Sequence, residues 1–485
     1  MNGADRVILL TGASGYVGRA LLHALESEGW HVRCMVRRPG MLQGQVAPGT
    51  EIVAGDVLEA SSLRPALQGV DTAFYLVHSM SSPGEFEQED RLAAMNFAAA
   101  AQASGVRRII YLGGLGESSS RLSAHLRSRH EVGEILRSSG VQTLEFRSSI
   151  VVGCGGFSFE MIRSLVERLP VMVTPRWVAT PTQPIAISDL ILYLMAGLKI
   201  EADGNRIYEI GGKDVSSYGD LMREYARHRG LHRLMIPVPL LTPRLSSLWL
   251  ALVTPYYSKV GRKLVDGLQN PTVVREPPDQ GLADIRPLGL QAAVAKALND
   301  EDLEFSSASW PRLLERRKVR PGRGAIHTGT RIIDTRVVRV AVPPDVVFQV
   351  LERIGGNTGW YCADWLWQVR GFLDRLVGGV GMRRGRRDPL RLEEGDALDF
   401  WRVETLERPA RLRLAAEMKV PGRAWLEFQV TRQGEESVLR QTAMFDALGL
   451  WGLAYWYLLY PVHAFIFAGM LRNIVRTASK PIAGQ

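Results

Sequence analysis

The stretch Val7–Gly18, VILLTGASGYVG, decides the fold of the first part of the chain. Its four apolar residues, Val7–Leu10, predict a buried strand, and the following Arg19–Glu28 predicts an amphipathic helix. Three glycines at three-residue spacing lie between them. A strand, a glycine turn and a helix in this order are typical of a dinucleotide-binding site. The alternative is a tight strand–helix turn that holds no ligand.

Each glycine of this turn has a separate expected role. Gly12 adopts backbone angles that other residues avoid, Gly15 lets the backbone approach a pyrophosphate, and Gly18 lets helix and strand pack closely. The helix N-terminus presents free N–H groups to the phosphates. The candidate cofactor-binding residues of the turn are Gly12, Ser14, Gly15, Tyr16, Val17 and Gly18.

The second predicted strand, His31–Val36, is followed by Arg37 and Arg38. An acidic residue at this position holds the ribose of NAD, whereas an arginine accommodates the 2′-phosphate of NADP. We therefore expect NADP(H) to be preferred, with NAD(H) as the second cofactor. The alternative is that both arginines are simply solvated in a loop.

Further apolar strands alternate with helical stretches, which predicts an α/β fold with a doubly wound parallel sheet of the Rossmann type. Ligands of such sheets bind beyond the carboxyl ends of the strands. Asp56 there could accept a hydrogen bond from adenine, or it could cap the helix through Leu63–Leu67. The predicted strands are Glu51–Val53, Thr72–Val77, Arg108–Leu112, Val141–Phe146 and Arg206–Ile210, and the candidate residues after them are Asp56, Val57, Val77 and His78.

Residues 5 to 300 resemble the short-chain dehydrogenase/reductase superfamily in its atypical and extended branches. The resemblance rests on GASGYVG, the arginine pair, Gly55-Asp-Val57 and Ile187-Ser-Asp189. YLVHSM (75–80), YLGGLG (111–116) and HLRSRHEVGEIL (125–136) are similar to a subgroup related to the NADPH-carrying accessory subunit of respiratory complex I. The resemblance implies NAD(P) binding.

The resemblance also implies catalytic positions. Reductases of the superfamily use Tyr-x-x-x-Lys, and the matching tetrad here runs from His125 to Arg129. An imidazole can donate a proton near neutral pH, and an arginine can hydrogen-bond a ribose. The pair is thus either a working catalytic site or the relic of one. His78, Tyr75 and Ser118 are candidates for the border of the same cleft, with a structural role as the alternative for His78.

The rest of the first domain is expected to shape a pocket for a small, apolar substrate. Phe157–Leu169 predicts a helix and Trp177–Ile187 an extended, proline-broken segment. The four prolines of Met235–Val260 exclude one continuous helix, so we expect a hydrophobic lid or interface there. We predict a first domain over residues 1–310, a basic linker over 311–328 and a second domain over 329–480.

The second domain opens with a predicted strand, Thr330–Val342, and a helix, Asp345–Ile354. Aromatic-rich turns with Trp360, Tyr361, Trp365 and Trp367 follow. Strand, helix, antiparallel sheet and terminal helix resemble the α+β helix-grip fold of START-like and polyketide-cyclase-like proteins, which implies a cavity for an apolar ligand. The tryptophans either line it or form plain core. Four alternating runs predict an antiparallel meander: Asp396–Glu404, Arg411–Met418, Ala424–Thr431 and Ser437–Phe445.

A long apolar helix, Leu448–Val475, is expected to close the chain and cover the meander. Ala447–Leu471 contains no charged residue and is long enough to cross a bilayer. We expect it to pack on the sheet instead, with peripheral membrane contact as a further possibility. The face predicted to pack on the sheet consists of Trp451, Tyr455, Leu458, Leu459 and Val462.

Composition sets the remaining limits. The net charge of +9 suits anionic ligands, membrane surfaces or nucleic acid without choosing among them. Three scattered cysteines favour a reducing compartment, and together with the absence of a leader pattern they predict a cytoplasmic protein, with association at the inner face of a membrane as an alternative. No metal site and no nucleic-acid partner are expected.

The densest basic cluster is either an anion-binding site or a solvated loop. It consists of Arg383, Arg384, Arg386 and Arg387.

These observations leave three functions open. The first is an NADP-dependent oxidoreductase of the atypical short-chain class that acts on a small or lipid-like carbonyl or alcohol. The second is a non-catalytic NADPH-binding module with a sensing, structural or assembly role. The third is a lipid-binding protein at the membrane periphery whose nucleotide domain regulates it.

Overall fold

The computed structural model describes residues 6–78, 86–116, 122–238, 267–278, 281–306, 326–328, 331–382 and 386–480. The chain forms two compact units. The N-terminal unit comprises Met1–Val166 and Pro170–Pro311, and the C-terminal unit comprises Glu167–Leu169 and Arg312–Gln485. Most of the predicted linker lies outside the described residues.

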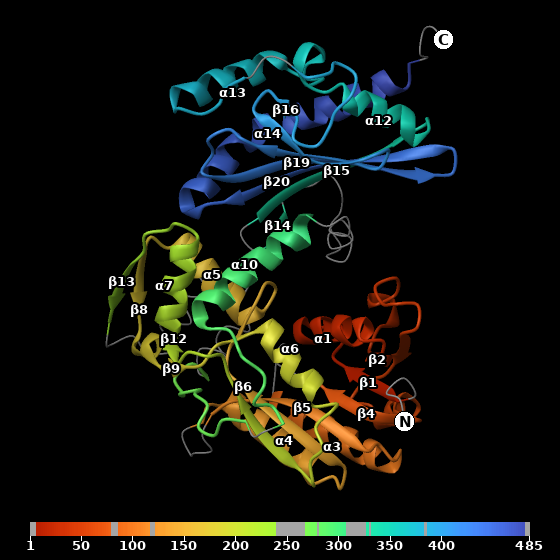
Figure 1. Ribbon diagram of the computed structural model, residues 1–485, viewed down its shortest axis with the longest axis vertical. Helices are drawn as coiled ribbons and strands as arrows, with labels where there is room; N and C mark the ends of the chain where they lie inside the picture. Colours follow the sequence, from red (N-terminus) through yellow and green to blue (C-terminus); the bar gives the residue numbers. More distant parts are fainter. Residues whose placement is uncertain are drawn as a thin grey trace. The chain divides into compact units, whose positions relative to one another are not determined.

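A parallel seven-stranded sheet in the order β11-β6-β5-β4-β1-β2-β3 forms the centre of the N-terminal unit (Figure 1). The strand order reverses between β1 and β4, as in a doubly wound fold. The fold class predicted for this part is therefore confirmed. The strands are β1 (Val7–Thr11), β2 (His31–Val36), β3 (Glu51–Ala54), β4 (Val70–Tyr75), β5 (Arg108–Gly114), β6 (Gln142–Ser148) and β11 (Arg206–Ile210).

Helices cover both faces of this sheet because successive strand residues point to opposite sides. Ile8 and Leu10 pack with α1 and α6, whereas Leu9 packs with α2 and α3 on the other face. The strands are buried on both faces, which explains their continuous apolar runs. The helices are α1 (Tyr16–Ser27), α2 (Ala60–Leu67), α3 (Phe86–Ala103), α4 (Ala124–Arg137) and α6 (Ile187–Ala196).

Three boundaries differ from the predictions in ways that matter for the site. Helix α1 begins at Tyr16 rather than Arg19, so Gly18 lies inside its first turn. Strand β4 ends at Tyr75 rather than Val77, so the residues after Tyr75 belong to the loop at the carboxyl edge. Strand β5 continues through Gly114 because the extended backbone tolerates both of its glycines.

Among the described residues, short strand pairs and three helices make up the rest of the N-terminal unit. A 3-10 turn, Arg176–Ala179, occupies the start of the segment predicted to be extended from Trp177, so that prediction is wrong at this point. Of Met235–Val260, residues 239–260 lie outside the described residues. The elements are β7 (Val151–Val152), α5 (Phe157–Arg168), β8 (Val171–Thr174), β9 (Pro181–Thr182), β10 (Ile185–Ala186), β12 (Ser216–Ser217), α7 (Tyr218–His228), β13 (Leu234–Pro237) and α10 (Leu290–Ser306).

The C-terminal unit contains an antiparallel seven-stranded sheet in the order β14-β15-β20-β19-β18-β17-β16. With its helices it forms an α+β fold, as predicted. Strand β14 lies within the stretch predicted to be linker, because Ile326 pairs with Ile333 and so adds an edge strand. The strands are β14 (Ile326–Thr328), β15 (Arg331–Val340), β16 (Ala397–Leu398), β17 (Trp401–Glu407), β18 (Arg411–Ala416), β19 (Gly422–Gln433) and β20 (Glu436–Ala447).

Two predictions about local structure in this unit are wrong. The single strand expected over Asp396–Glu404 is a tight hairpin of β16 and β17, whose turn holds Asp399 at a φ of 55°. Aspartate tolerates this left-handed conformation better than most residues do. The aromatic turns expected around Trp365 are instead a helix, α13 (Asp364–Leu376). The other helices are α12 (Pro344–Glu352) and α14 (Gly449–Ala478).

The aromatic residues between helix α13 and the sheet are mostly core. Trp360 is 1% exposed, and its ring stacks on that of Trp367 with centroids 5.0 Å apart. Phe400 and Trp401 pack around the same ring. Trp365 differs, because its side chain is 64% exposed.

Helix α14 covers the sheet with a face that includes Tyr455 of the predicted set, whose ring lies 5.7 Å from that of Phe445, but excludes Trp451 and Leu458. Trp451 and Leu458 are 83% and 80% exposed, whereas Trp456, Met470 and Ile474 are buried in the core. In a helix that is apolar on all sides, the sequence does not indicate which side faces the core. The spacing of apolar residues was therefore not enough to predict the buried face. In the described part of the chain, α14 alone is long and apolar enough to cross a membrane, and 33% of its most apolar window is buried.

Candidate functional site

The glycine turn between β1 and α1 leaves no room for side chains at two of its positions. Gly12 has a φ of +70°, and a Cβ there would lie 2.8 Å from the Leu76 carbonyl oxygen. A Cβ on Gly18 would lie 2.2 Å from the Gly12 carbonyl oxygen. The Gly15 N–H donates to the same oxygen at 2.8 Å and closes the turn. Both substitutions would therefore push apart the backbone that a dinucleotide contacts.

The same turn is tied to the end of β4. The Thr11 hydroxyl donates to the Phe74 carbonyl at 2.8 Å and accepts from the Leu76 N–H at 3.1 Å. This pair of bonds places Val77 and His78 beside the turn at the carboxyl edge of the sheet, where ligands of parallel sheets bind. Ser14 lies exposed on the turn.

Tyr16 and Val17 form the first turn of α1. The Tyr16 ring lies against the glycines after β7, since a Cβ on Gly153 or Gly156 would lie under 3 Å from it. Tyr16 therefore joins the dinucleotide turn to the loop that follows β6 and β7. Val17 is half-buried and packs on the core beneath.

Arg37 and Arg38 are exposed at the carboxyl end of β2. Neither guanidinium bonds to another described residue. Asp56, after β3, accepts the Leu58 N–H at 3.0 Å and so caps the turn before α2, not the helix, whose N-cap is Glu59. Val57 is buried beside it.

Arg129 occupies the most constrained position at this edge. Its guanidinium lies over the Tyr111 ring, 4.9 Å from the centroid, and Nη2 donates to the Leu112 carbonyl. The side chain is 7% exposed, and its Nη1 is buried without a hydrogen-bond partner in the described residues. A buried guanidinium donor without an acceptor is costly, and a ligand oxygen would remove that cost.

His125 lies one turn before Arg129 on α4. Their spacing of four places both on one face of the helix. Because α4 follows β5, its N-terminus lies at the carboxyl edge, and Leu126 packs against Gly114 of β5. His125 is half-buried there. The structure thus brings His125 and Arg129 to the edge that carries the glycine turn, and their catalytic roles stay a prediction.

Two further histidines lie at the same edge. Part of the His78 side chain is exposed, although many protein atoms lie around its ring. Desolvation by these atoms lowers the pKa of the imidazole, and the positive charge of Arg129 lowers it further. It is neutral at pH 7 for this reason. His130, which the sequence did not single out, lies 3.1 Å from the Gly114 carbonyl oxygen through Nε2. Burial lowers the pKa of His130 as well.

Tyr75 does not border a cleft, contrary to the sequence-based expectation. It is 1% exposed and packs among Phe97 and Tyr111 in the core. Burial raises the pKa of its hydroxyl well above the usual range. A strand that is apolar on both faces gave no signal that Tyr75 would point into the core. Ser118 lies outside the described residues.

A cluster of hydroxyl groups lies beyond β6 that the sequence did not reveal. Ser149 Oγ is 2.6 Å from Thr182 Oγ1 and 2.7 Å from Thr272 Oγ1, and the two threonine oxygens are 2.8 Å apart. Tyr218 bonds to both threonines, and burial raises its pKa to about 12. The four residues come from distant segments, so no motif could have found them. A small apolar pocket adjoins them, lined by Ile150, Ser158, Met161, Ile162, Leu165, Trp177, Tyr218, Met222 and Leu268.

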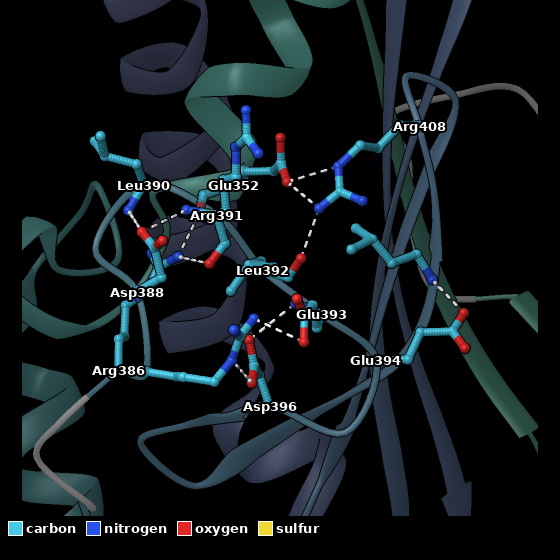
Figure 2. Close-up of polar contacts among 12 residues, drawn as sticks. Glu352, Arg386, Asp388, Leu390, Arg391, Leu392, Glu393, Glu394, Asp396 and Arg408 are labelled. Carbon is cyan, nitrogen blue, oxygen red and sulfur yellow. Dashed lines mark hydrogen bonds and ion pairs between the residues drawn. The ribbon is translucent and has the colours of Figure 1, made fainter.

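Two arginines of the cluster in the C-terminal unit form hydrogen bonds and ion pairs in and around their own loop (Figure 2). Arg386 donates to the carbonyls of Ile354 and Glu352 at 3.0 and 2.6 Å. Arg387 pairs with Asp396 and Glu393 at 3.2 and 3.0 Å. These two arginines brace the loop, so they match neither the predicted anion-binding cluster nor the predicted solvated loop. Arg383 and Arg384 lie outside the described residues, and no group of three metal-ligating side chains occurs among the residues described.

Comparisons with known proteins agree with this geometry. Residues 12–149 match a family described as NAD(P)H-binding, and residues 326–470 match a family described as a protein of unknown function (DUF2867). The triphenylmethane reductase of Citrobacter sp., solved with NADP(H), superposes with a TM-score of 0.50 at 17% identity, covering 60% of this chain and 99% of that chain. At this identity the likeness shows the fold.

Three curated relatives are similar to the N-terminal part. "Photosystem II assembly factor Ycf39" of Cyanophora paradoxa is 24% identical over 240 residues, 48% of this chain and 72% of that protein. The "ceramide reductase" of Caulobacter vibrioides is 25% identical over 242 residues, 49% and 74%. A "(4-alkanoyl-5-oxo-2,5-dihydrofuran-3-yl)methyl phosphate reductase" of Streptomyces griseus is 33% identical over 181 residues, 36% of this chain and 60% of that enzyme.

The glycine turn, the parallel sheet and these matches lead to one conclusion. The first part of the chain is an NAD(P)H-binding domain of the Rossmann type, with the architecture of reductase-like proteins.

Proposed function

We propose that this protein is an NADP(H)-dependent oxidoreductase that acts on a small or lipid-like carbonyl or alcohol. The observation that carries the proposal is the buried, unpartnered Nη1 of Arg129 at the carboxyl edge, beside the glycine turn. A core arginine with an unused donor is expected where a ligand oxygen completes its hydrogen bonds.

The described residues fit the cofactor. The absence of side chains at Gly12 and Gly18 lets the backbone of the turn close tightly, and Arg37 and Arg38, which bond to no other described residue, offer a cationic site for a 2′-phosphate. The nicotinamide, when bound, supplies or accepts a hydride. Arg129 holds a ribose or substrate oxygen through Nη1. His125, on the same face of α4, delivers a proton to the carbonyl oxygen.

The apolar pocket and the hydroxyl cluster favour an apolar substrate. Ser149 immediately follows β6, so this cluster begins at the cofactor edge. Its hydroxyls orient one polar group, and the apolar side chains beside them, which enclose space for about one water molecule, border that end of the substrate. The name of one relative, the furanone phosphate reductase, includes an alkanoyl group, and another is named a ceramide reductase, which supports this class.

A second candidate function is non-catalytic NADPH binding with a structural or assembly role. His125 and Arg129 replace the tyrosine and lysine that the superfamily resemblance leads us to expect. A relative of similar coverage is named an assembly factor. Under this proposal the cofactor stabilises the N-terminal unit, and no turnover occurs.

For the C-terminal unit we propose a START-like relationship and an apolar ligand between sheet and helices. The order of strand, helices, meander and terminal helix supports this, as does the packing of α14 on the sheet. We place the protein in the cytoplasm, in keeping with its three cysteines, none of which forms a disulfide with another described residue.

Oxidation of NADPH by the full chain tests the proposal, with decanal and 2-undecanone as probes. His125→Ala is expected to lower kcat by about a hundredfold and leave the NADPH Kd unchanged, because a proton donor acts only in the transition state. Arg129→Met is expected to weaken NADPH binding as well. Arg127→Ala is the matched control, since Arg127 is exposed on the opposite side of α4.

The outcomes separate the two candidates. NADPH binding without oxidation by any probe favours the non-catalytic function. An active wild type whose turnover survives His125→Ala would assign proton transfer to another group, and His78 would be tested next.

A further inference from the structure

We propose that helix α13 docks the C-terminal unit on the surface of a bilayer that carries anionic headgroups. The proposal concerns an interaction surface and does not depend on the oxidoreductase function. It rests on a continuous exposed apolar face, a rigid inner face and a cationic rim.

The outer face of α13 is apolar and exposed over its whole length. Trp365, Phe372 and Leu376 are 64%, 62% and 67% exposed, which is unusual for such large side chains. Val369 and Leu373 complete the face at 47% and 50%. Spacings of three, four and seven place these residues on one side of the helix, the pattern of a helix that lies in a membrane interface.

The inner face of α13 is held by the unit itself. Trp367 stacks on Trp360 and donates from Nε1 to the Cys362 carbonyl at 3.1 Å. Gly371 lets the helix approach Met382, where a Cβ would lie 2.5 Å from Met382 Cγ. Asp374, fully buried, accepts the backbone N–H groups of Gly381 and Lys419 at 2.9 and 2.7 Å. The helix therefore keeps its orientation without any contribution from the outer face, and no ordering step is needed on docking.

Cationic groups border the C-terminal end of this face. Arg375 donates to the Met382 carbonyl at 2.8 Å and the Lys419 ammonium to the Val377 carbonyl at 3.2 Å. Their partners are neutral, so both charges remain available to headgroups. Arg370 lies 3.8 Å from Asp374, so this rim carries three cations against one carboxylate.

The cationic rim consists of Arg370, Arg375 and Lys419, because Arg386 and Arg387 of the following loop bond within that loop. Basic residues next to an apolar helix face favour anionic lipid surfaces.

Charge complementarity favours a bilayer over a second copy of the chain. Two copies that met through α13 would bring Arg375 and Lys419 of one near those of the other, and each chain carries a net charge of +9. Trp365 and Phe372 suit the headgroup–acyl boundary, where amphipathic aromatic rings are enriched. The exposed stripe of α14, with Trp451 and Leu458, also ends in exposed cations, Arg472 and Arg476, so the flotation experiment compares the two helices.

Flotation of the full chain with lipid vesicles tests the proposal. The vesicles are pure phosphatidylcholine or phosphatidylcholine with one third phosphatidylglycerol. Wild type is expected to float with the anionic vesicles, weakly with the neutral ones, and less at high salt. The triple variant Trp365→Gln/Phe372→Gln/Leu376→Gln is expected to bind at least about tenfold more weakly.

Matched controls separate docking from misfolding. Leu92, Met95 and Leu192 are 50–55% exposed in the N-terminal unit, and their triple change to Gln should leave flotation unchanged. Arg375→Gln/Lys419→Gln should reduce binding to anionic vesicles alone, by about fivefold or more for each charge. All variants are compared for an unaltered Tm of unfolding.

Three results would overturn the proposal. One is a wild type that floats with neither vesicle. Another is an α13 triple variant that floats like wild type, or a loss of flotation caused instead by Trp451→Gln/Leu458→Gln in α14. The third is a wild type that is dimeric by light scattering and becomes monomeric in the α13 triple variant without any vesicle binding, which would assign the face to a second copy.

Discussion

The two units use their charged residues in opposite ways. At the carboxyl edge of the N-terminal sheet, Arg37 and Arg38 are unpaired and Arg129 retains an unused buried donor. In the C-terminal sheet, Arg411 pairs with Glu427 at 2.9 Å in a fully buried contact. The first unit thus leaves polar groups for an anionic, hydrogen-bonding ligand. In the second, Arg411 is paired with a buried carboxylate, and the apolar helix faces stay exposed.

This contrast shows that net charge is a poor guide to where a ligand binds. The arginines of the loop after α13 looked like the densest anion site in the sequence, yet Arg386 and Arg387 brace their own loop. The pair after β2 is shorter and carries no acidic neighbour. Whether an arginine is available depends on the acceptors that folding brings to it.

Gly18→Ala should give the largest effect, and in the N-terminal unit alone. The new Cβ would stand 2.2 Å from the Gly12 carbonyl oxygen, so α1 must move away from the turn. We expect the NADPH Kd to rise by more than about a hundredfold, or the N-terminal unit to unfold at a lower temperature. Calorimetric titration and thermal unfolding measure the two effects.

Gly40→Ala is the control for this change, because Gly40 lies in an open loop with no atom near a new Cβ. Binding unchanged in Gly18→Ala would show that the turn does not form the cofactor site.

Acid should affect the C-terminal unit through His463. Its ring packs on Trp456 and Phe467, and burial lowers its pKa to about 4, with Arg370 acting in the same direction and Asp334 against it. The unfolded chain binds a proton below about pH 6.5. The contribution of the neutral His463 to the free energy of unfolding is therefore fully present above that pH. It is lost as pH falls towards 4, by up to about 3 kcal/mol.

Urea unfolding of wild type and His463→Phe between pH 7.5 and 4.5 measures how much His463 contributes to the pH dependence of the free energy of unfolding. The variant should lose less stability over that range than wild type does. Equal losses would mean that the imidazole does not set the acid response.

Arg37→Ala/Arg38→Ala should give the smallest effect and the most specific one. Loss of charge-assisted contacts to a 2′-phosphate is expected to weaken NADPH binding by about tenfold or more and leave NADH binding unchanged. Titration of both cofactors against wild type and variant measures the ratio. Equal affinity of wild type for NADPH and NADH would contradict the cofactor preference.

The sequence predicted most of the N-terminal site because its signals are local. The glycine turn, the alternation of strands and helices and the residues after each strand follow from short-range patterns, and β2 and β11 have the predicted bounds. The position of Tyr75 and the hydroxyl cluster around Ser149 could not be predicted, since they depend on which distant segments pack together. In the C-terminal unit the missed helix α13 begins within an aromatic-rich stretch that resembles turns as much as helix.

By itself, the sequence determined that a nucleotide-binding α/β part precedes an antiparallel α+β part, since glycine spacing and hydrophobic period are read from neighbouring residues. The tertiary structure alone decided which side of each apolar helix faces the core. Trp456 and Met470 became core while Trp451 and Leu458 remained exposed, although all four are apolar. Burial is non-directional and favours any apolar side chain equally, so only the shape of the sheet beneath α14 could choose among them.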